Sequence, residues 1–269
     1  ILEALRGEIP NLVSATLERA CNLSCSHCLF QDEHSSFKAS RQARVAQIVE
    51  NLVRQIPTVE ESSRHAPPAF LDDGRILRQW HFELFDKIRA ARPDVAIGII
   101  DNGTYTNFLN EFKKRGLRLD ALNISLDSME ESHDAQRDPI KKRAYRDAVH
   151  GLEHGREVVK PYVKGGRVSS LMTLTCVNYH DAGDVADFLF SQNPHQSAKN
   201  PESGERFSYA DELVLSTMNP LYEADFNRNV GPHDLEISKE QLAESWRQIR
   251  QAIVKHPERK ITLRIYRNA

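Results

Sequence analysis

The chain has 269 residues, of which 40% are hydrophobic and 28% charged, a globular balance with ample material for a core. This length is long for one small domain, short for two average ones, and suitable for a single α/β barrel. The formal net charge of -2 gives no general attraction to nucleic acids or membranes, and neither a membrane-spanning stretch nor a signal peptide is visible. We therefore expect a cytoplasmic protein without a nucleic-acid or membrane partner.

Short β-rich runs alternate with amphipathic helical stretches along the chain. Strands are expected at residues 11–18, 69–72, 95–100, 122–126, 168–177 and 213–218, with 261–266 as a seventh. Helices are expected at residues 43–56, 141–156 and 181–190, and around Leu84, Phe112 and Trp246. Ser238 and Gln241 form a capping box at the start of the last of these helices.

This alternation predicts a parallel sheet covered by helices, with the active site at the carboxyl ends of the strands. Because six or seven units are fewer than the eight of a complete barrel, we expect an α/β fold, a partial (βα)6-type TIM barrel. Residues 1–269 are expected to form one domain. The chain opens at Ile1 rather than Met and closes in a strand-like stretch, so we expect both ends to be trimmed and leave open a further C-terminal domain.

The segment 191–206 is rich in Ser, Asn, Pro and Gly and predicts a long loop. Loops of this length are either lids and binding loops or surface insertions. The sequence does not distinguish the two.

Three of the four cysteines, Cys21, Cys25 and Cys28, lie within eight residues. Soft thiolate ligands select iron–sulfur clusters, zinc or copper(I). A structural zinc site needs a fourth ligand, which only His27, His34 or the remote Cys176 could supply, and a non-enzymatic Cys3His zinc module is the alternative interpretation. A cubane iron–sulfur cluster held by three thiolates instead keeps one iron free for a substrate or cofactor.

The segment resembles the signature of the radical S-adenosylmethionine (SAM) superfamily, Cys-x3-Cys-x-aromatic-Cys, with His27 in the aromatic position. The resemblance implies that Cys21, Cys25 and Cys28 bind a [4Fe–4S] cluster and that the fourth iron binds SAM. The backbone near His27 would contact the adenine. It further implies a 5'-deoxyadenosyl radical that abstracts hydrogen from a peptide or a small amino-acid-like metabolite. A flavodoxin- or ferredoxin-type protein would donate the electron.

Further positions resemble the family along most of the chain. Asp101-Asn102-Gly103-Thr104 resembles its Thr-Asn-Gly-Thr segment, which implies a SAM contact for Asn102, although an Asn-Gly turn needs no function. Ser125 and Asp127 resemble its Ser-x-Asp pattern, in which the polar groups face SAM. For Asp127, a cap or an ion-pair partner for Arg137 or Arg143 is the alternative.

Arg137 resembles a residue that holds the SAM carboxylate; a solvated charge at a helix start is the alternative. On the fifth strand, Thr173, Thr175 and Asn178 resemble positions near the SAM ribose and methionine, although threonine is also a good strand residue. For Ser216 and Met218 on the sixth strand, packing is favoured over a backbone contact to adenine.

The family's Gly-Gly-Glu-Pro motif, which binds the SAM amino group, is missing after the second strand. Residues 71–75 occupy its place, and Asp72 or Asp73 is expected to accept from the ammonium instead. Cys176 is expected to be a buried small hydrophobic residue. The alternative is that its thiol donates a hydrogen atom to a substrate radical. A basic stretch is interpreted as solvated surface or as a dock for an acidic electron donor; it contains Arg156, Lys160, Lys164 and Arg167.

Overall fold

The structure is a computed structural model that describes most of the chain. The described residues are 12–15, 17, 21–23, 25–26, 38–58, 68–72, 77–138, 140–161, 165–196, 199, 201, 204–217 and 235–264. No helix among them is long and apolar enough to cross a bilayer.

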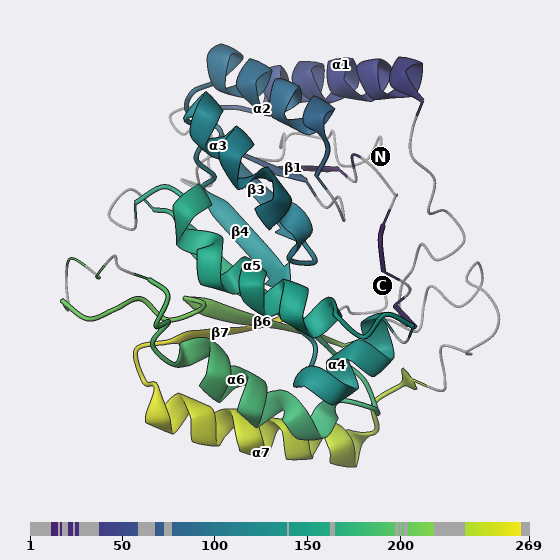
Figure 1. The fold of residues 1–269 in the computed structure, drawn as a ribbon, viewed down its shortest axis with the longest axis vertical. Helices are drawn as coiled ribbons and strands as arrows, with labels where there is room; N and C mark the ends of the chain where they lie inside the picture. The colour runs from purple at the N-terminus through teal and green to yellow at the C-terminus, as the bar shows by residue number, and fades with distance from the viewer. Residues whose placement is uncertain are drawn as a thin grey trace.

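Seven parallel strands form one sheet in which each strand pairs with the next along the chain (Figure 1). The strands are β1 (Leu12–Ala15), β2 (Ala69–Asp72), β3 (Ala96–Asp101), β4 (Ala121–Ser125), β5 (Arg167–Leu174), β6 (Glu212–Thr217) and β7 (Lys260–Arg264). Parallel strands in sequence order have crossovers of one hand, which places the helices on one face. The predicted α/β class and partial parallel barrel are confirmed, with the seventh strand present.

The helices lie outside the sheet as layers that follow the strand order. They are α1 (Ala39–Gln55), α2 (Gln79–Ala91), α3 (Leu109–Arg115), α4 (Glu130–Arg137), α5 (Ala144–Val158), α6 (Ala182–Phe190) and α7 (Lys239–Lys255). In Figure 1, α1 and α2 cover one end of the sheet, α6 and α7 the other, and α3 and α5 the strands between them.

The two faces of the sheet differ in polarity because strand side chains alternate. Leu122 and Val168 are fully buried on the face that packs on Gly155 of α5, where a Cβ on Gly155 would lie 3.0 Å from Val168 Cγ1. The alternate positions of the central strands carry mostly polar side chains: Asn123, Ser125, Ser169, Thr173 and Ser216. The inner face of the partial barrel is therefore polar, and its carboxyl edge can receive a polar ligand.

Element boundaries depart from expectation where buried hydrogen bonds end or begin an element. The fifth strand ends at Leu174, before the expected residue 177, because Asn178 Oδ1 accepts from the Thr175 N–H group at 2.8 Å and closes a turn. The helix expected at 141–156 is α5, and α4 precedes it as a separate helix that the sequence did not predict. Asp134 Oδ1 accepts from the Tyr145 N–H group at 2.7 Å and joins the two helices.

Candidate functional site

The cysteine segment lies against the start of α5. Cys25 is 3% exposed and packs with Cys21 near Ala144, the first residue of that helix. Cys28, the third predicted ligand, and His27, predicted beside the adenine, lie outside the described residues. The structure thus brings two of the three predicted cluster ligands together in a largely buried position.

Two hydrogen bonds, both through Gln136, connect the cysteine segment to the carboxyl edge of the sheet. The Ser26 N–H group donates to the Gln136 backbone oxygen at 2.8 Å. The Gln136 side chain in turn accepts from Thr175 Oγ1 at 3.3 Å, just after β5. Sequence reasoning missed Gln136, because a buried glutamine in a short helix looks like any surface glutamine.

Asn102 is the second anchor of the cysteine segment. Its Nδ2 donates to Asn22 Oδ1 at 2.8 Å and lies 3.7 Å from Cys21 Sγ. Its Oδ1 accepts from Thr104 Oγ1 at 2.8 Å, which fixes the orientation of the amide. Asn102 therefore lies beside a predicted cluster ligand, and its contact with SAM stays a prediction.

A close approach between two glycines holds this turn against α5. Gly103 has φ 98°, a left-handed conformation, and a Cβ there would lie 2.3 Å from the Asp147 backbone oxygen. A Cβ on Gly151 would lie 2.8 Å from Gly103 Cα. The segment is an Asn-Gly turn and, at the same time, the structure that brings Asn102 to the cysteines.

Asp101 stands where the family's pattern has threonine. Its Oδ1 accepts from the N–H groups of Gly103 at 2.7 Å and Tyr105 at 3.1 Å, so the carboxylate builds the same turn. Its Oδ2 is buried and has no hydrogen-bond partner among the described residues. Burial raises the pKa of Asp101 to about 7 despite these backbone hydrogen bonds.

Arg137 and Asp127 form a buried ion pair. Arg137 Nε donates to Asp127 Oδ2 at 2.5 Å, and the two side chains are 7% and 0% exposed. Burial alone lowers the pKa of Arg137, but the charges of Asp127, Cys25 and Cys21 raise it above its usual value. The alternative that Arg137 is a solvated charge at a helix start is therefore wrong: it is buried at the end of α4, near the cysteines.

Both carboxylate oxygens of Asp127 accept hydrogen bonds from within the protein. Its Oδ1 accepts from the Thr173 N–H group at 2.9 Å, while Oδ2 holds Arg137. Asn178 Nδ2 donates to the backbone oxygens of Asp127 and Thr173, each at 2.8 Å. Asn178, Thr175 and Asp127 thus form one buried network at the ends of β4 and β5, and their contacts with SAM stay predictions.

Two further predicted SAM-binding positions, Asp72 and Ser125, lie along the same edge. Asp72 ends β2, is 1% exposed, and accepts from the Leu17 N–H group at 3.4 Å. Ser125 ends β4 and is 8% exposed. Asp73 and Met218 lie outside the described residues.

Cys176 lies in the turn after β5 rather than on the strand. The prediction that Cys176 belongs to the fifth strand is therefore wrong, and its side chain is partly exposed rather than buried. Its N–H group donates to the Leu235 backbone oxygen at 3.2 Å. The structure does not test a role as hydrogen donor.

Two of the four residues of the basic stretch, Arg156 and Lys160, form ion pairs, and Arg167 is exposed. Arg156 forms an ion pair with Asp211 and is 8% exposed, and Lys160 Nζ lies 2.5 Å from Asp120 Oδ1. Lys164 lies outside the described residues. Arg156 and Lys160 therefore serve the fold rather than an open basic surface.

Comparison with known proteins agrees with this arrangement. The family described as "Radical SAM superfamily" matches residues 17–189. Among solved structures, SuiB of Streptococcus suis bound to S-adenosylmethionine aligns with a TM-score of 0.60 and 11% identity, covering 97% of this chain and 51% of that one. SuiB bound to its precursor peptide SuiA aligns with a TM-score of 0.61 and 11% identity, covering 95% and 49%.

At this identity the likeness to SuiB concerns the fold alone. The chain spans about half the length of these solved chains, with 51% and 49% of them covered. No curated protein sequence matches the chain.

Proposed function

Because the chain belongs to the radical SAM superfamily, we propose that it is an enzyme that binds a [4Fe–4S] cluster through Cys21, Cys25 and Cys28. SAM bound at that cluster would start hydrogen abstraction from a peptide or a small amino-acid-like metabolite. The observation that carries the proposal is the attachment of the cysteine segment to the carboxyl edge of the sheet, through Ser26 to Gln136 and Asn22 to Asn102. Ligands of parallel α/β folds bind at this edge.

The donor set fits such a cluster. Thiolates are its ordinary ligands, and three of them leave one iron for a further ligand. The buried cation of Arg137 offsets negative charge at Cys21 and Cys25. Cys25 is buried, which protects it from solvent.

A [4Fe–4S] cluster with bound SAM would supply one-electron chemistry for hydrogen abstraction from the substrate. The chain's own residues would bind and orient SAM. Arg137 offers its remaining guanidinium N–H groups to the SAM carboxylate, and Asp127 holds it in place. Asp72 or Asp73 accepts from the SAM ammonium.

The other polar groups at the edge serve the ribose, the adenine and the methionine portion of SAM. We assign this role to Ser125, Asn102, Thr175 and Asn178, with the backbone near His27 beside the adenine. The polar inner face of the central strands, which carries Asn123 and Ser169, supports a polar ligand in the barrel.

A peptide is the substrate class we favour. SuiB, which shares this fold, has been solved with its precursor peptide SuiA. The reducing electron would come from a flavodoxin- or ferredoxin-type protein in a cytoplasmic, reducing compartment.

Metal analysis after anaerobic purification tests the proposal. Cluster-loaded protein should contain about four irons and four sulfides per chain, and SAM should perturb the electron paramagnetic resonance signal of the reduced cluster. The variant with Cys21, Cys25 and Cys28 all replaced by Ala should contain neither iron nor sulfide. Stoichiometric zinc without iron or sulfide, lost when Cys21, Cys25 and Cys28 are replaced by Ala, would instead identify the Cys3His zinc module and overturn the proposal.

A further inference from the structure

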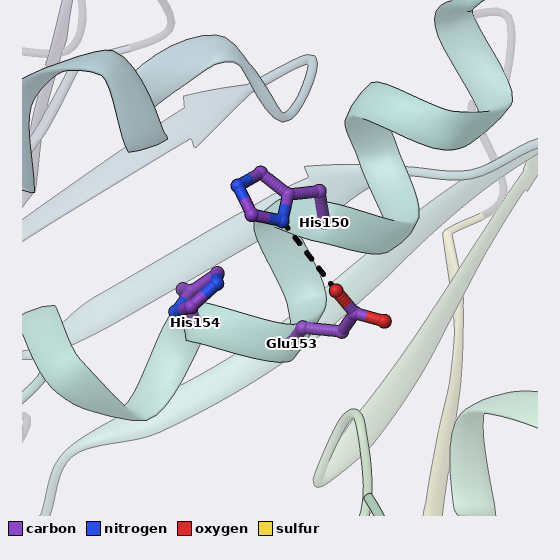
Figure 2. Close-up of side chains that lie close together, drawn as sticks. All are labelled: His150, Glu153 and His154. Carbon is purple, nitrogen blue, oxygen red and sulfur yellow. Dashed lines mark hydrogen bonds and ion pairs between the residues drawn. The ribbon is translucent and has the colours of Figure 1, made fainter. Parts of the chain in front are cut away.

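A second group of metal-ligand side chains lies on α5, apart from the cysteine segment. His150, Glu153 and His154 project from one helix, as Figure 2 shows, because positions i, i+3 and i+4 share a helix face. One ligand atom from each lies within 4.8 Å of the other two. His150 and His154 are six and ten residues beyond Ala144, so they lie about 9 and 15 Å along the helix from the cysteine contact.

A histidine from another part of the chain contacts the glutamate of this group. His195 Nε2 lies 3.3 Å from Glu153 Oε1, while His150 Nδ1 lies 3.4 Å from Glu153 Oε2. Glu153 thus lies between two imidazoles from different segments.

Buried hydrogen bonds set the position of His195. The side chains of Asn193 and Gln196 donate to the Glu153 backbone oxygen, at 3.2 Å and 2.6 Å. Both are buried, with 1% and 7% exposure, and the His195 N–H group donates to Asn193 Oδ1 at 2.9 Å. These hydrogen bonds therefore hold the segment that carries His195 against α5 at Glu153.

The outer partners of His154 also suit a metal ligand. Its Nδ1 lies 2.5 Å from Glu157 Oε1, and Lys113 Nζ lies 3.3 Å from the other oxygen of Glu157. A carboxylate on one ring nitrogen fixes the tautomer and leaves the other nitrogen as a ligand, as in many zinc sites.

We propose that His150, Glu153, His154 and His195 bind one Zn²⁺ ion. Three imidazoles and one carboxylate match zinc, whereas Mg²⁺ and Ca²⁺ require mostly oxygen ligands. Donor atoms around a tetrahedral zinc are about 3.3 Å apart. The ligand atoms of His150, Glu153 and His154 lie within 4.8 Å of one another, so these side chains would rotate toward the ion on binding. Four protein ligands make a closed, structural site that links α5 to the segment 191–196 on the outside of the barrel.

Zinc titration of the full-length chain tests this site. The cysteine segment must not bind zinc itself. The titration therefore uses the variant with Cys21, Cys25 and Cys28 replaced by Ala, and is repeated on cluster-loaded protein. One Zn²⁺ should bind in both cases and raise the melting temperature. Co²⁺ in the same site should give a spectrum without thiolate charge-transfer bands.

Matched variants separate this site from adventitious binding. His150→Ala and His154→Ala should each weaken Zn²⁺ binding more than about 100-fold, because a lost ligand costs more than a lost outer partner. Glu157→Gln should weaken it about tenfold. His180→Ala removes an exposed histidine elsewhere and should change nothing.

Unchanged zinc affinity in both His150→Ala and His154→Ala would overturn the proposal, as would thiolate bands in the Co²⁺ spectrum. Because the triple alanine variant contains no cluster, these results are independent of the radical SAM proposal. A melting curve without zinc shows that each variant is folded.

Discussion

Arg137 Nε lies 2.5 Å from Asp127 Oδ2, and both side chains are buried at the carboxyl edge of the sheet. The pair lies between β5 and the cysteine segment, since Asp127 also accepts from the Thr173 N–H group and the charge of Cys25 raises the pKa of Arg137. Breaking a buried ion pair on one side leaves the other charge uncompensated, at a cost of about 3–5 kcal/mol. The same ion pair therefore stabilises this edge of the sheet and fixes the position of the Arg137 guanidinium.

We expect Asp127→Asn to weaken SAM binding through Arg137. The amide can still accept from the Thr173 N–H group but no longer holds the guanidinium as an ion pair. The SAM dissociation constant of the cluster-loaded protein should rise about ten- to a hundredfold, the equivalent of roughly 1.5–3 kcal/mol. Calorimetric titration of SAM measures this, beside a melting curve that should shift downward.

The double variant Asp127→Asn with Arg137→Gln serves as its control. Removing both charges should restore part of the lost thermal stability, because no uncompensated charge stays buried. SAM affinity should stay low. If Asp127→Asn lowers the melting temperature but leaves SAM affinity unchanged, the pair has a structural role only and neither residue belongs to the SAM-binding site.

Asn102→Ala should make the cluster more labile. The variant loses the hydrogen bond to Asn22 and the amide beside Cys21 Sγ. One such hydrogen bond is worth about 1 kcal/mol, so loss of the iron–sulfur absorbance in air should be about fivefold faster. Asn123→Ala is the control, because Asn123 donates to the Ile99 backbone oxygen at 3.4 Å, away from the cysteines. Equal rates in the two variants would contradict the anchoring role.

Gly103→Ala should destabilise the protein more than Gly116→Ala does. Both glycines have positive φ, 98° and 61°, so each substitution carries the left-handed penalty of about 1–2 kcal/mol. Only at Gly103 would the new Cβ also meet backbone atoms of α5, whereas at Gly116 nothing lies within 4 Å. Urea unfolding of both variants measures the difference, and similar losses would argue against the close packing of the turn on α5.

The pH dependence of stability should change in Asp101→Asn. Burial raises the pKa of Asp101 from 3.8 to about 7. Between these values the folded protein keeps a proton that the unfolded chain has lost, so this group's contribution to stability falls as pH rises from about 4 to 7. The asparagine variant lacks this decline.

Melting temperatures of the cluster-free protein across pH 5 to 8 test this expectation. Relative to the unmodified protein, Asp101→Asn should gain stability steadily up to about pH 7 and then no further. A constant offset at every pH would show that Asp101 does not titrate in this window.

Much of the fold was predictable from the sequence, because each strand–helix unit carries its own local pattern. The apolar runs of β3 and β4 and the capping box at Ser238 depend only on neighbouring residues. The boundary of β5 and the helix α4 were not predictable, because Asn178 and Asp134 fix them by buried hydrogen bonds.

The candidate site was predictable at the cysteines, whose spacing is itself the signal. Arg137 was predicted to hold the SAM carboxylate, and an ion pair with Asp127 was the alternative for that aspartate, which the structure contains. The burial of the pair was not predicted, because it depends on packing between segments that local sequence does not encode. Gln136 and the group around Glu153 were missed for the same reason. In both cases the contacts join segments far apart in the chain.

Formation of 5'-deoxyadenosine tests the central claim most directly. Anaerobic, cluster-loaded and reduced protein is incubated with SAM, and the products are separated by chromatography. The account predicts 5'-deoxyadenosine and methionine in equal amounts, formed slowly even without substrate and not formed by the variant with Cys21, Cys25 and Cys28 replaced by Ala. A different SAM cleavage product from protein with an intact cluster, or none at all, would contradict it.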